Sequence, residues 1–323
     1  MGGPTAEPAA GPPPTVLQEG TTSNTFSFVV PTEFVELPSQ GNFYTEEHPL
    51  CGQESIEIKQ MTAKEEDMLT STTLLRKGVA LDRVIRSLIV DKRINPDTLL
   101  VGDRNAIILS ARVSGYGSDY NTKVTCPSCT VTSEYSFDLN DASVYTGTDL
   151  TEQELVDNQD GTFDTILPKT QITVTFKLLT GNDEKNLTSA AQADRKKSNY
   201  EKNVTRQLSN LVVAVNGDDS AQAIQYLIDN IPSIDSRHIR TIYRRAAPNI
   251  DLTQRYACTE CDYAADMEVP LSADFERLIK QLDDEKQAHE DAARGGGGKS
   301  QTLSAQNQPS PPPHLMQMGD RNK

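Results

Sequence analysis

The sequence predicts an α+β fold built from two pseudo-repeated halves. Segments with the alternating pattern of strands are mixed with segments of helical periodicity, without the regular strand–helix–strand alternation typical of a parallel sheet. Residues 103–139 align without a gap with residues 235–271, and Asp103 meets Asp235 in this alignment. Both aligned blocks carry a Cys-x-x-Cys pair at the same position. A duplicated unit that contains one cysteine pair explains these observations together.

The first half is predicted to span residues 25–140. The preceding residues, 1–24, are rich in proline, glycine, alanine and threonine and are expected to be a disordered tail. A strand begins at Ile58, and Thr62 with Glu65 three residues later forms a capping box that predicts the start of a helix. The remaining predicted elements are helices over Leu81–Val90 and Asp103–Val113 and strands over 123–125 and 131–139, on either side of the first cysteine pair.

The second half is predicted to span residues 141–275. The turn at Asn158–Thr162 and the strand Gln171–Leu178 predict a hairpin that joins the halves. Thr180 and Asp183 repeat the capping pattern of the first half, so a second helix is expected to begin there. The other predicted elements are helices over Val204–Val215, Ala221–Asn230 and Ser236–Ala246 and weaker strands over 255–257 and 262–269. An insertion at Arg195–Asn203 is expected to account for the different spacing of matching segments in the two halves.

Beyond the second half the sequence becomes polar. Residues 276–294 are predicted to form a polar helix, because a short apolar stripe ends at Leu282 and the rest of the segment is charged. Residues 295–323 have no periodic apolar pattern and are predicted to be a disordered tail. The run Gly295–Ser300 resembles a phosphate-binding loop, but Ala293 stands where the first glycine is required, so we interpret the run as a flexible linker.

Four of the five cysteines are predicted to form one structural zinc site. A Cys-x-x-Cys knuckle presents two thiolates to one Zn²⁺, and two knuckles complete a closed tetrahedron with no open position for water or substrate. The two pairs lie much farther apart along the chain than in a local zinc ribbon. A pseudo-twofold axis between repeated halves would nevertheless bring equivalent knuckles face to face. The predicted ligands are Cys126, Cys129, Cys258 and Cys261.

Three other interpretations of the cysteine pairs stay open at this point: a redox dithiol, structural disulfides, and unligated core thiols. A redox Cys-x-x-Cys usually opens a helix, whose N-terminus lowers the thiol pKa, whereas strand-like sequence flanks both pairs here. Disulfides are not expected in a reducing compartment. Cys51 stands apart from both pairs, and we interpret it as a buried or loop thiol without chemistry.

The composition argues against several classes of function. A net charge of −15 is the opposite of the basic footprint of nucleic-acid-binding proteins, although a zinc-ribbon nucleic-acid-binding or transcription accessory protein remains the alternative. No apolar run approaches the roughly 20 residues of a membrane-spanning helix, and no secretion signal is evident, so we expect a protein that is cytosolic or assembled from the cytosol. The four histidines are scattered and form no catalytic set. We therefore expect neither an enzyme nor a small-molecule substrate.

An ordered series of short motifs resembles the baseplate hub protein family of T4-like contractile-tailed bacteriophages. The motifs lie between about residues 27 and 275, and their order, rather than any single motif, carries the resemblance. They are Leu37–Tyr44 (LPSQGNFY), Pro49–Leu50, Met61–Leu69 (MTAKEEDML), Leu75–Gly78, Gly102–Asn105, Ala111–Arg112, Tyr116–Gly117 and Tyr120.

This resemblance implies a structural or assembly role in the baseplate hub, through protein–protein contacts with other baseplate hub or tail proteins. It places the protein in the virion baseplate, or in the host cytoplasm during assembly, and it supplies no catalytic residues. Two contact surfaces are expected from the sequence. One is the LPSQGNFY segment, in which Phe43 and Tyr44 are either exposed anchors or core residues, and the other is the helix that begins near Ala273.

Overall fold

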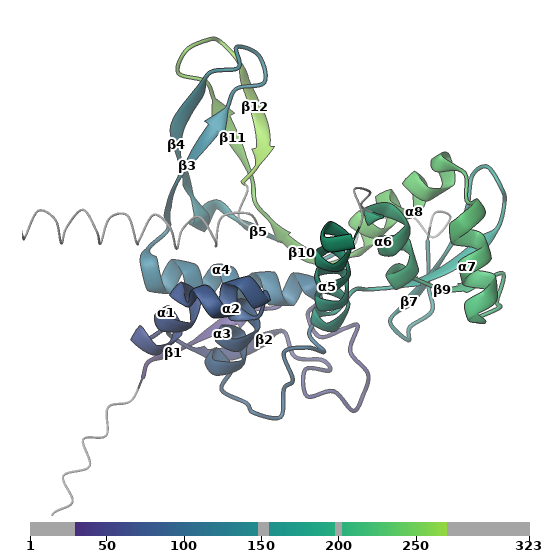
Figure 1. The fold of residues 1–323 in the computed structure, drawn as a ribbon. Helices are drawn as coiled ribbons and strands as arrows, with labels where there is room; N and C mark the ends of the chain where they lie inside the picture. The colour runs from purple at the N-terminus through teal and green to yellow at the C-terminus, as the bar shows by residue number, and fades with distance from the viewer. Residues whose placement is uncertain (1–29, 148–154, 198–201, 270–323) are drawn as a thin grey trace, which may run out of the picture. The chain divides into compact units, whose positions relative to one another are not determined.

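The computed structural model describes residues 30–147, 155–197 and 202–269. These residues hold eight α-helices and several small antiparallel sheets, which confirms the predicted α+β class (Figure 1). The predicted tails, 1–24 and 295–323, and the predicted polar helix, 276–294, lie outside the described residues. Within the described ranges, no helix is both long and apolar enough to cross a membrane.

The described chain begins with a hairpin and three short helices. Strands β1 (Thr32–Glu36) and β2 (Ser55–Lys59) pair in antiparallel fashion along their full length. The predicted capping box is present, because the Glu65 carboxylate accepts the Thr62 N–H at 3.0 Å and α1 (Ala63–Thr70) begins there. Helices α2 (Thr72–Lys77) and α3 (Ala80–Leu88) follow. Ile89, directly after α3, then bridges to Ile58 of β2.

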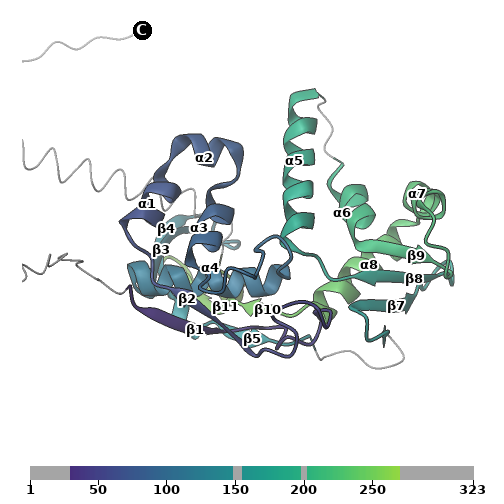
Figure 2. The ribbon, with the colours of Figure 1, turned by 90° about the horizontal axis from the view of Figure 1, so that it is seen from below.

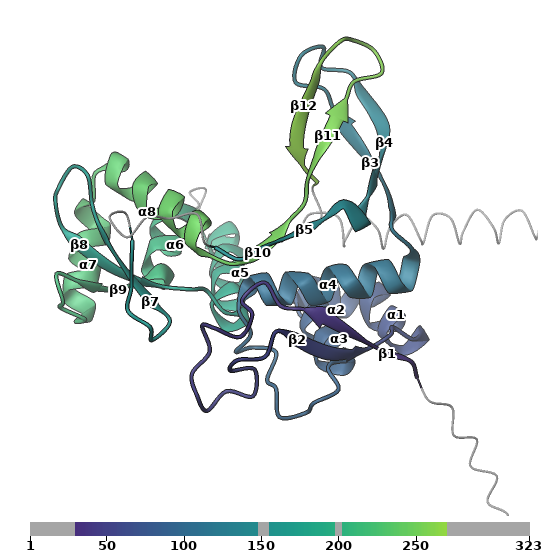
Figure 3. The same cartoon turned by 180° about the vertical axis from the view of Figure 1, so that it is seen from behind.

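Helix α4 (Val101–Tyr116) is the longest helix of this region and packs against β1 and α3 (Figure 3). Ile107 and Ala111 on the apolar side of this helix are buried. Arg104 is also buried, and its guanidinium donates to the Asp82 carboxylate of α3 at 2.8 Å and to a backbone carbonyl. At the start of the helix, a Cβ on Gly102 would come within 2.0 Å of the Pro248 carbonyl oxygen. Only glycine therefore permits this close approach of two distant segments.

A four-stranded antiparallel sheet with helices packed on it forms the next region (Figure 2). Its strands are β6 (Val156–Asp157), β7 (Thr162–Ile166), β8 (Thr173–Lys177) and β9 (Val212–Val215). The helices of this region are α5 (Gly181–Lys197), α6 (Asn203–Leu211), α7 (Ala221–Asn230) and α8 (Ser233–Ala246). Buried aromatic and aliphatic side chains from both layers form one core, among them Val174, Phe176, Leu208, Ile239 and Ile242.

The predicted helix over Val204–Val215 is wrong in its last turn. Helix α6 ends at Leu211, and the valine-rich run Val212–Val215 forms strand β9, which pairs with β8. β-Branched valines lose side-chain freedom in a helix and pack well in a sheet, and β8 provides an edge for them to pair with. Apolar periodicity within one segment does not reveal such a neighbouring edge, so the prediction ran the helix too far.

Two further hairpins lie side by side (Figures 1 and 3). The first consists of β3 (Asp119–Thr125) and β4 (Thr132–Asp138), and the second of β11 (Thr253–Ala257) and β12 (Ala264–Glu268). A 3₁₀ turn (Leu139–Asp141) and β5 (Ser143–Tyr145) follow the first hairpin, and β5 pairs with β10 (Asn249–Asp251), which precedes the second. This pairing brings the bases of the two hairpins together although they are far apart in sequence.

Candidate metal centre

Backbone hydrogen bonds shape each cysteine knuckle into a tight turn at the end of its hairpin. In the first knuckle, Cys126 N–H donates to the Val131 carbonyl at 2.9 Å, and Thr130 N–H donates to the Cys126 carbonyl at 2.9 Å. Thr130 closes this turn with a left-handed backbone, at φ 60°. In the second knuckle, Cys258 N–H donates to the Tyr263 carbonyl at 2.9 Å. Each knuckle therefore joins the two strands of its hairpin.

The four predicted ligand residues converge on one point. The Sγ atoms of Cys126, Cys129, Cys258 and Cys261 all lie within 4.8 Å of one another. Cys126 Sγ lies 3.8 Å from Cys261 Sγ, and Cys129 Sγ lies 3.7 Å from Cys258 Sγ. In a tetrahedron of thiolates around Zn²⁺, with metal–sulfur distances of about 2.3 Å, the sulfurs lie about 3.8 Å apart. The donor set and its spacing therefore fit a tetrahedral metal ion.

The same distances distinguish a metal site from disulfides. A disulfide requires sulfurs about 2.05 Å apart, and these two pairs between the knuckles are separated by nearly twice that distance. All five cysteines are free thiols. The close pairs each join the first cysteine of one knuckle to the second cysteine of the other. A metal bound here would therefore link the two hairpins to each other.

The local electrostatics favour the thiolate form of Cys258 and disfavour that of Cys129. The backbone N–H of Glu260 donates to Cys258 Sγ at 3.4 Å and, with the Cys261 N–H, lowers the pKa of Cys258 to about 6. The Val131 N–H lowers the pKa of Cys129, but desolvation and hydrogen bonds with the other three thiols outweigh it and raise that pKa to about 12. Four ionised thiols this close together need a cation to balance them.

Contacts below the knuckles hold the hairpins together without any metal. The rings of Tyr135 and Tyr256 meet edge to face, with centroids 5.0 Å apart. Tyr135 Oη donates to the Arg255 carbonyl at 3.1 Å, and Gln254 Nε2 donates to the Asp138 carbonyl at 2.7 Å. The hairpins therefore hold the cysteines close to the geometry that a metal requires, which reduces the ordering entropy lost on binding.

The comparison with protein families concerns this whole region. A family model described as T4 bacteriophage base plate protein matches residues 31–275. This match includes both hairpins and all four converging cysteines, and it covers more than half of the chain. The chain belongs to this baseplate family. Searches of curated proteins and of solved structures find no match. The resemblance seen in the ordered motifs is confirmed at the level of this family.

Cys51, His48 and His238 do not join the cysteine cluster of this baseplate protein. Cys51 is half-buried, and its N–H donates to the His48 carbonyl in a separate loop. His48 stacks on Tyr44, with ring centroids 4.3 Å apart, and His238 of α8 lies 3.3 Å from the Thr165 hydroxyl. Within the described ranges, the four cysteines are the one group of three or more histidine, cysteine or acidic residues whose ligand atoms converge.

The structure decides between the two interpretations of Phe43 and Tyr44. Both side chains are half-buried and pack on the core of the four-stranded sheet, and the ring of Phe43 lies 5.8 Å from that of Phe163. Tyr44 Oη donates to Asp103 at 2.7 Å, and burial raises the pKa of this hydroxyl well above its usual range. Phe43 and Tyr44 are therefore packing residues in this baseplate protein.

Sequence reasoning overlooked two buried carboxylates that anchor loops in the two halves. Asp103 of α4 accepts the Ser39 N–H at 3.0 Å and the Ser39 hydroxyl at 2.6 Å, and burial raises its pKa. Asp235 of α8 accepts the N–H groups of Lys169 and Thr170 at 2.8 and 3.0 Å. Each carboxylate anchors a loop to the start of a helix. The alignment of Asp103 with Asp235 was the signal that could have identified them.

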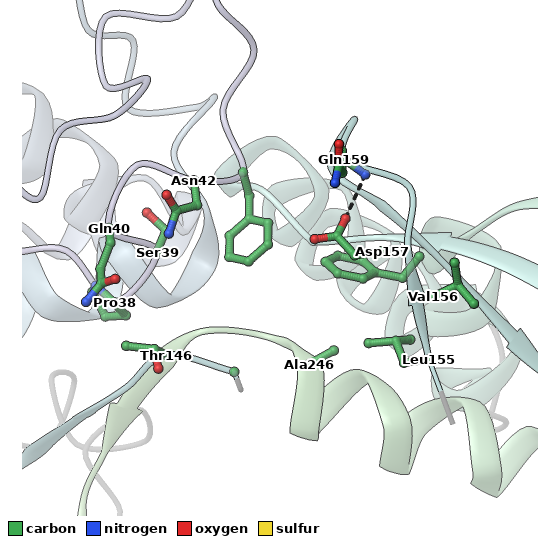
Figure 4. Close-up of a pocket in the computed structure, with 13 residues that line it drawn as sticks. Pro38, Ser39, Gln40, Asn42, Thr146, Leu155, Val156, Asp157, Gln159 and Ala246 are labelled. Atoms are coloured by element: carbon green, nitrogen blue, oxygen red, sulfur yellow. Dashed lines mark hydrogen bonds between the residues drawn. The ribbon is translucent and has the colours of Figure 1, made fainter. Parts of the chain in front are cut away.

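A cavity of about 620 Å³ lies between the LPSQGNFY loop and the four-stranded sheet (Figure 4). Its wall includes Asn42, Phe43, Thr146 and Phe163. Asp157 is the one titratable side chain among the lining residues, and its carboxylate accepts the Gln159 N–H at 2.8 Å. A single engaged carboxylate does not form an acid–base pair, so this wall provides no catalytic set.

Proposed function

We propose that this baseplate protein is a structural or assembly component of the baseplate hub, and that a structural Zn²⁺ joins its two hairpins. The observation that carries this proposal is the convergence of four thiols from two knuckles in a chain of the baseplate family. The family supports a structural role in the phage baseplate. The choice of zinc, and of the hub within the baseplate, is our inference.

The choice of zinc rests on the donor set. Zn²⁺ accepts four thiolates in a tetrahedron, and this arrangement leaves no position for water or substrate. Bound here, the ion would act structurally, and its binding free energy would become part of the folding free energy. The backbone N–H groups of the knuckles stabilise thiolate charge, and the hydrogen-bonded hairpins hold the sulfurs at the required spacing.

Parallel features of the two halves, 25–140 and 141–275, support the proposed duplication. In each half an antiparallel strand pair leads into a Thr-capped helix, and a residue directly after a later helix bridges back to the second strand. Ile89 makes this bridge after α3, and Val212 makes it after α6. Asp103 anchors the loop that follows the Leu-Pro pair at residues 37–38. Asp235 likewise anchors the loop that follows the Leu-Pro pair at residues 167–168.

One helix has no counterpart in the first half. Helix α7 lies between β9 and α8, whereas the segment between Ile89 and α4 contains no helix. We infer that α7 is the main inserted segment, in addition to the insertion expected at Arg195–Asn203. With α7 set aside, each half supplies one knuckle, and a pseudo-twofold relation explains why the first cysteine of each pair approaches the second cysteine of the other.

We further infer that the protein acts through contacts with other baseplate or tail proteins rather than by catalysis. The alternative, a zinc-ribbon nucleic-acid-binding protein, is disfavoured by the net charge of −15, because phosphate binding depends on a basic surface. Steep salt-dependent binding of DNA or RNA by the purified protein would support that alternative.

The proposal is tested in a phage that lacks this gene. Wild-type protein supplied in trans should restore particles, and mass spectrometry should detect it in hub-containing particles or in assembly intermediates. A variant with Cys258→Ser and Cys261→Ser should fail to restore assembly, whereas the matched control Cys51→Ser should succeed. Absence of the protein from both particles and intermediates would contradict the hub assignment. Purified protein without about one zinc per chain would contradict the metal assignment alone.

A further inference from the structure

Three arginines lie along one face of helix α8. Arg237, Arg240 and Arg244 follow one another at helical spacings of three and four residues, which places them on the same side of the helix. Together with Gln207 of the neighbouring helix α6 they line a groove of about 270 Å³. We call this the arginine groove. All four lining residues are long polar side chains, and none is acidic.

These guanidinium groups have no acidic partner in the part of the chain that the structure describes. Arg240 Nε donates to the Ser236 carbonyl of its own helix at 3.3 Å, and no ion pair joins any of the three to a described carboxylate. Asp235, the nearest acid in sequence, is fully buried and engaged by the Lys169 and Thr170 N–H groups. It is therefore not available to neutralise the groove.

Other arginines of this protein do have an acidic partner. Arg104 is buried and lies 2.8 Å from the Asp82 carboxylate, and exposed Arg93 lies 2.7 Å from Asp91. In a chain with a net charge of −15, where acidic residues outnumber basic ones, three adjacent guanidiniums without such a partner form a local positive site. They also repel one another on one helix face, and a bound anion would relieve that repulsion.

We propose that the arginine groove docks an acidic segment of another tail protein. Guanidiniums bind carboxylates in a bidentate, planar geometry, and three of them in a row match a segment with several aspartates or glutamates. Exposed apolar side chains lie one helical turn from the groove, Ile234 before Arg237 on α8 and Val204 before Gln207 on α6. They offer apolar contacts to a protein segment.

The experiment uses the full-length protein and a fluorescein-labelled oligoglutamate peptide as the probe, followed by fluorescence anisotropy. The test variant carries Arg237→Gln, Arg240→Gln and Arg244→Gln. The matched control carries Arg76→Gln, Arg83→Gln and Arg93→Gln, three exposed positions outside the groove. Both variants lose three positive charges, so their net charges change equally. Circular dichroism and the melting temperature establish that both remain folded.

We expect the test variant to bind the oligoglutamate at least about tenfold more weakly than wild type, and the control to bind it as wild type does. An oligoglutamine peptide should not bind, and the affinity for oligoglutamate should fall with added salt. Equal weakening in both variants would show that only net charge matters, and would overturn the proposal. Tighter binding of a single-stranded DNA of the same charge than of oligoglutamate would also overturn it, in favour of a phosphate-binding surface.

Discussion

Removal of one cysteine knuckle should destabilise the protein by a magnitude that follows from its topology. We consider the variant with Cys258→Ser and Cys261→Ser, which leaves a metal ion with two ligands from one hairpin only. In the native protein the metal would link cysteines separated by 129 positions along the chain. The loop-closure relation gives about 5 kcal/mol of stabilisation for a cross-link over such a distance. For a domain of this size, that loss corresponds to a fall in melting temperature of about 10–20 °C.

The assay is differential scanning calorimetry of zinc-loaded protein, with the zinc content measured by elemental analysis. Wild-type protein stripped with a strong chelator should melt at the same lowered temperature as the double variant, because both have lost the cross-link. Cys51→Ser is the matched control and should keep both the metal and the melting temperature, since Cys51 lies in a separate loop. If the double variant had the same melting temperature as zinc-loaded wild-type protein, the metal would not cross-link the hairpins and our reasoning would be refuted.

Three further predictions concern the buried polar groups. Asp235→Ala should lower the free energy of unfolding by about 3 kcal/mol in urea titrations, because two backbone N–H groups lose a buried charged acceptor, and a loss below about 1 kcal/mol would contradict this role. Arg104→Met should lower the free energy of unfolding by about 3 kcal/mol, because the half-buried Asp82 carboxylate loses its arginine. Arg93→Met breaks an exposed ion pair and should change that free energy by less than about 1 kcal/mol. Similar effects of the two substitutions would contradict this difference between the buried and the exposed pair. Burial alone raises the pKa of Asp183, but hydrogen bonds from Lys177 and Thr180 outweigh it and hold this pKa below its usual value. The resulting stabilisation is therefore complete above the usual carboxyl pKa of about 4 and is lost as the pH falls through the lower pKa of the folded state. Asp183→Asn should make the urea midpoint less dependent on pH on the acid side. An unchanged dependence on pH would contradict this role of Asp183.

Local signals in the sequence predicted much of the secondary structure. The threonine caps at Thr62 and Thr180 mark the starts of α1 and α5, because a cap involves residues only three positions apart. The strands around each knuckle were predicted for a similar reason, since alternation is visible within one segment. The burial of Phe43 and the strand Val212–Val215 were harder to predict. Their burial and pairing depend on the neighbouring sheet, and one segment read alone does not contain that information.

For the candidate site too, some features were predicted from the sequence and others required the structure. The identity of the four ligands followed from residue type and spacing, and the alignment of Cys126 with Cys258 indicated that the knuckles are equivalent. The arginine groove was not predicted from the sequence. Helical spacing alone places the three arginines on one face of α8. It does not show that Asp235 turns inward, and that observation is what leaves the groove without an acid.

By itself the sequence determined the α+β class, the ordered motifs of the baseplate family and the set of thiols able to hold a metal. These properties depend on residue type and on spacing along the chain. Only the tertiary structure decided that the two knuckles meet, with Cys126 Sγ 3.8 Å from Cys261 Sγ, and that the buried acids anchor loops rather than neutralise arginines. Such contacts join residues far apart in the chain, and their geometry comes from packing and strand pairing throughout the fold.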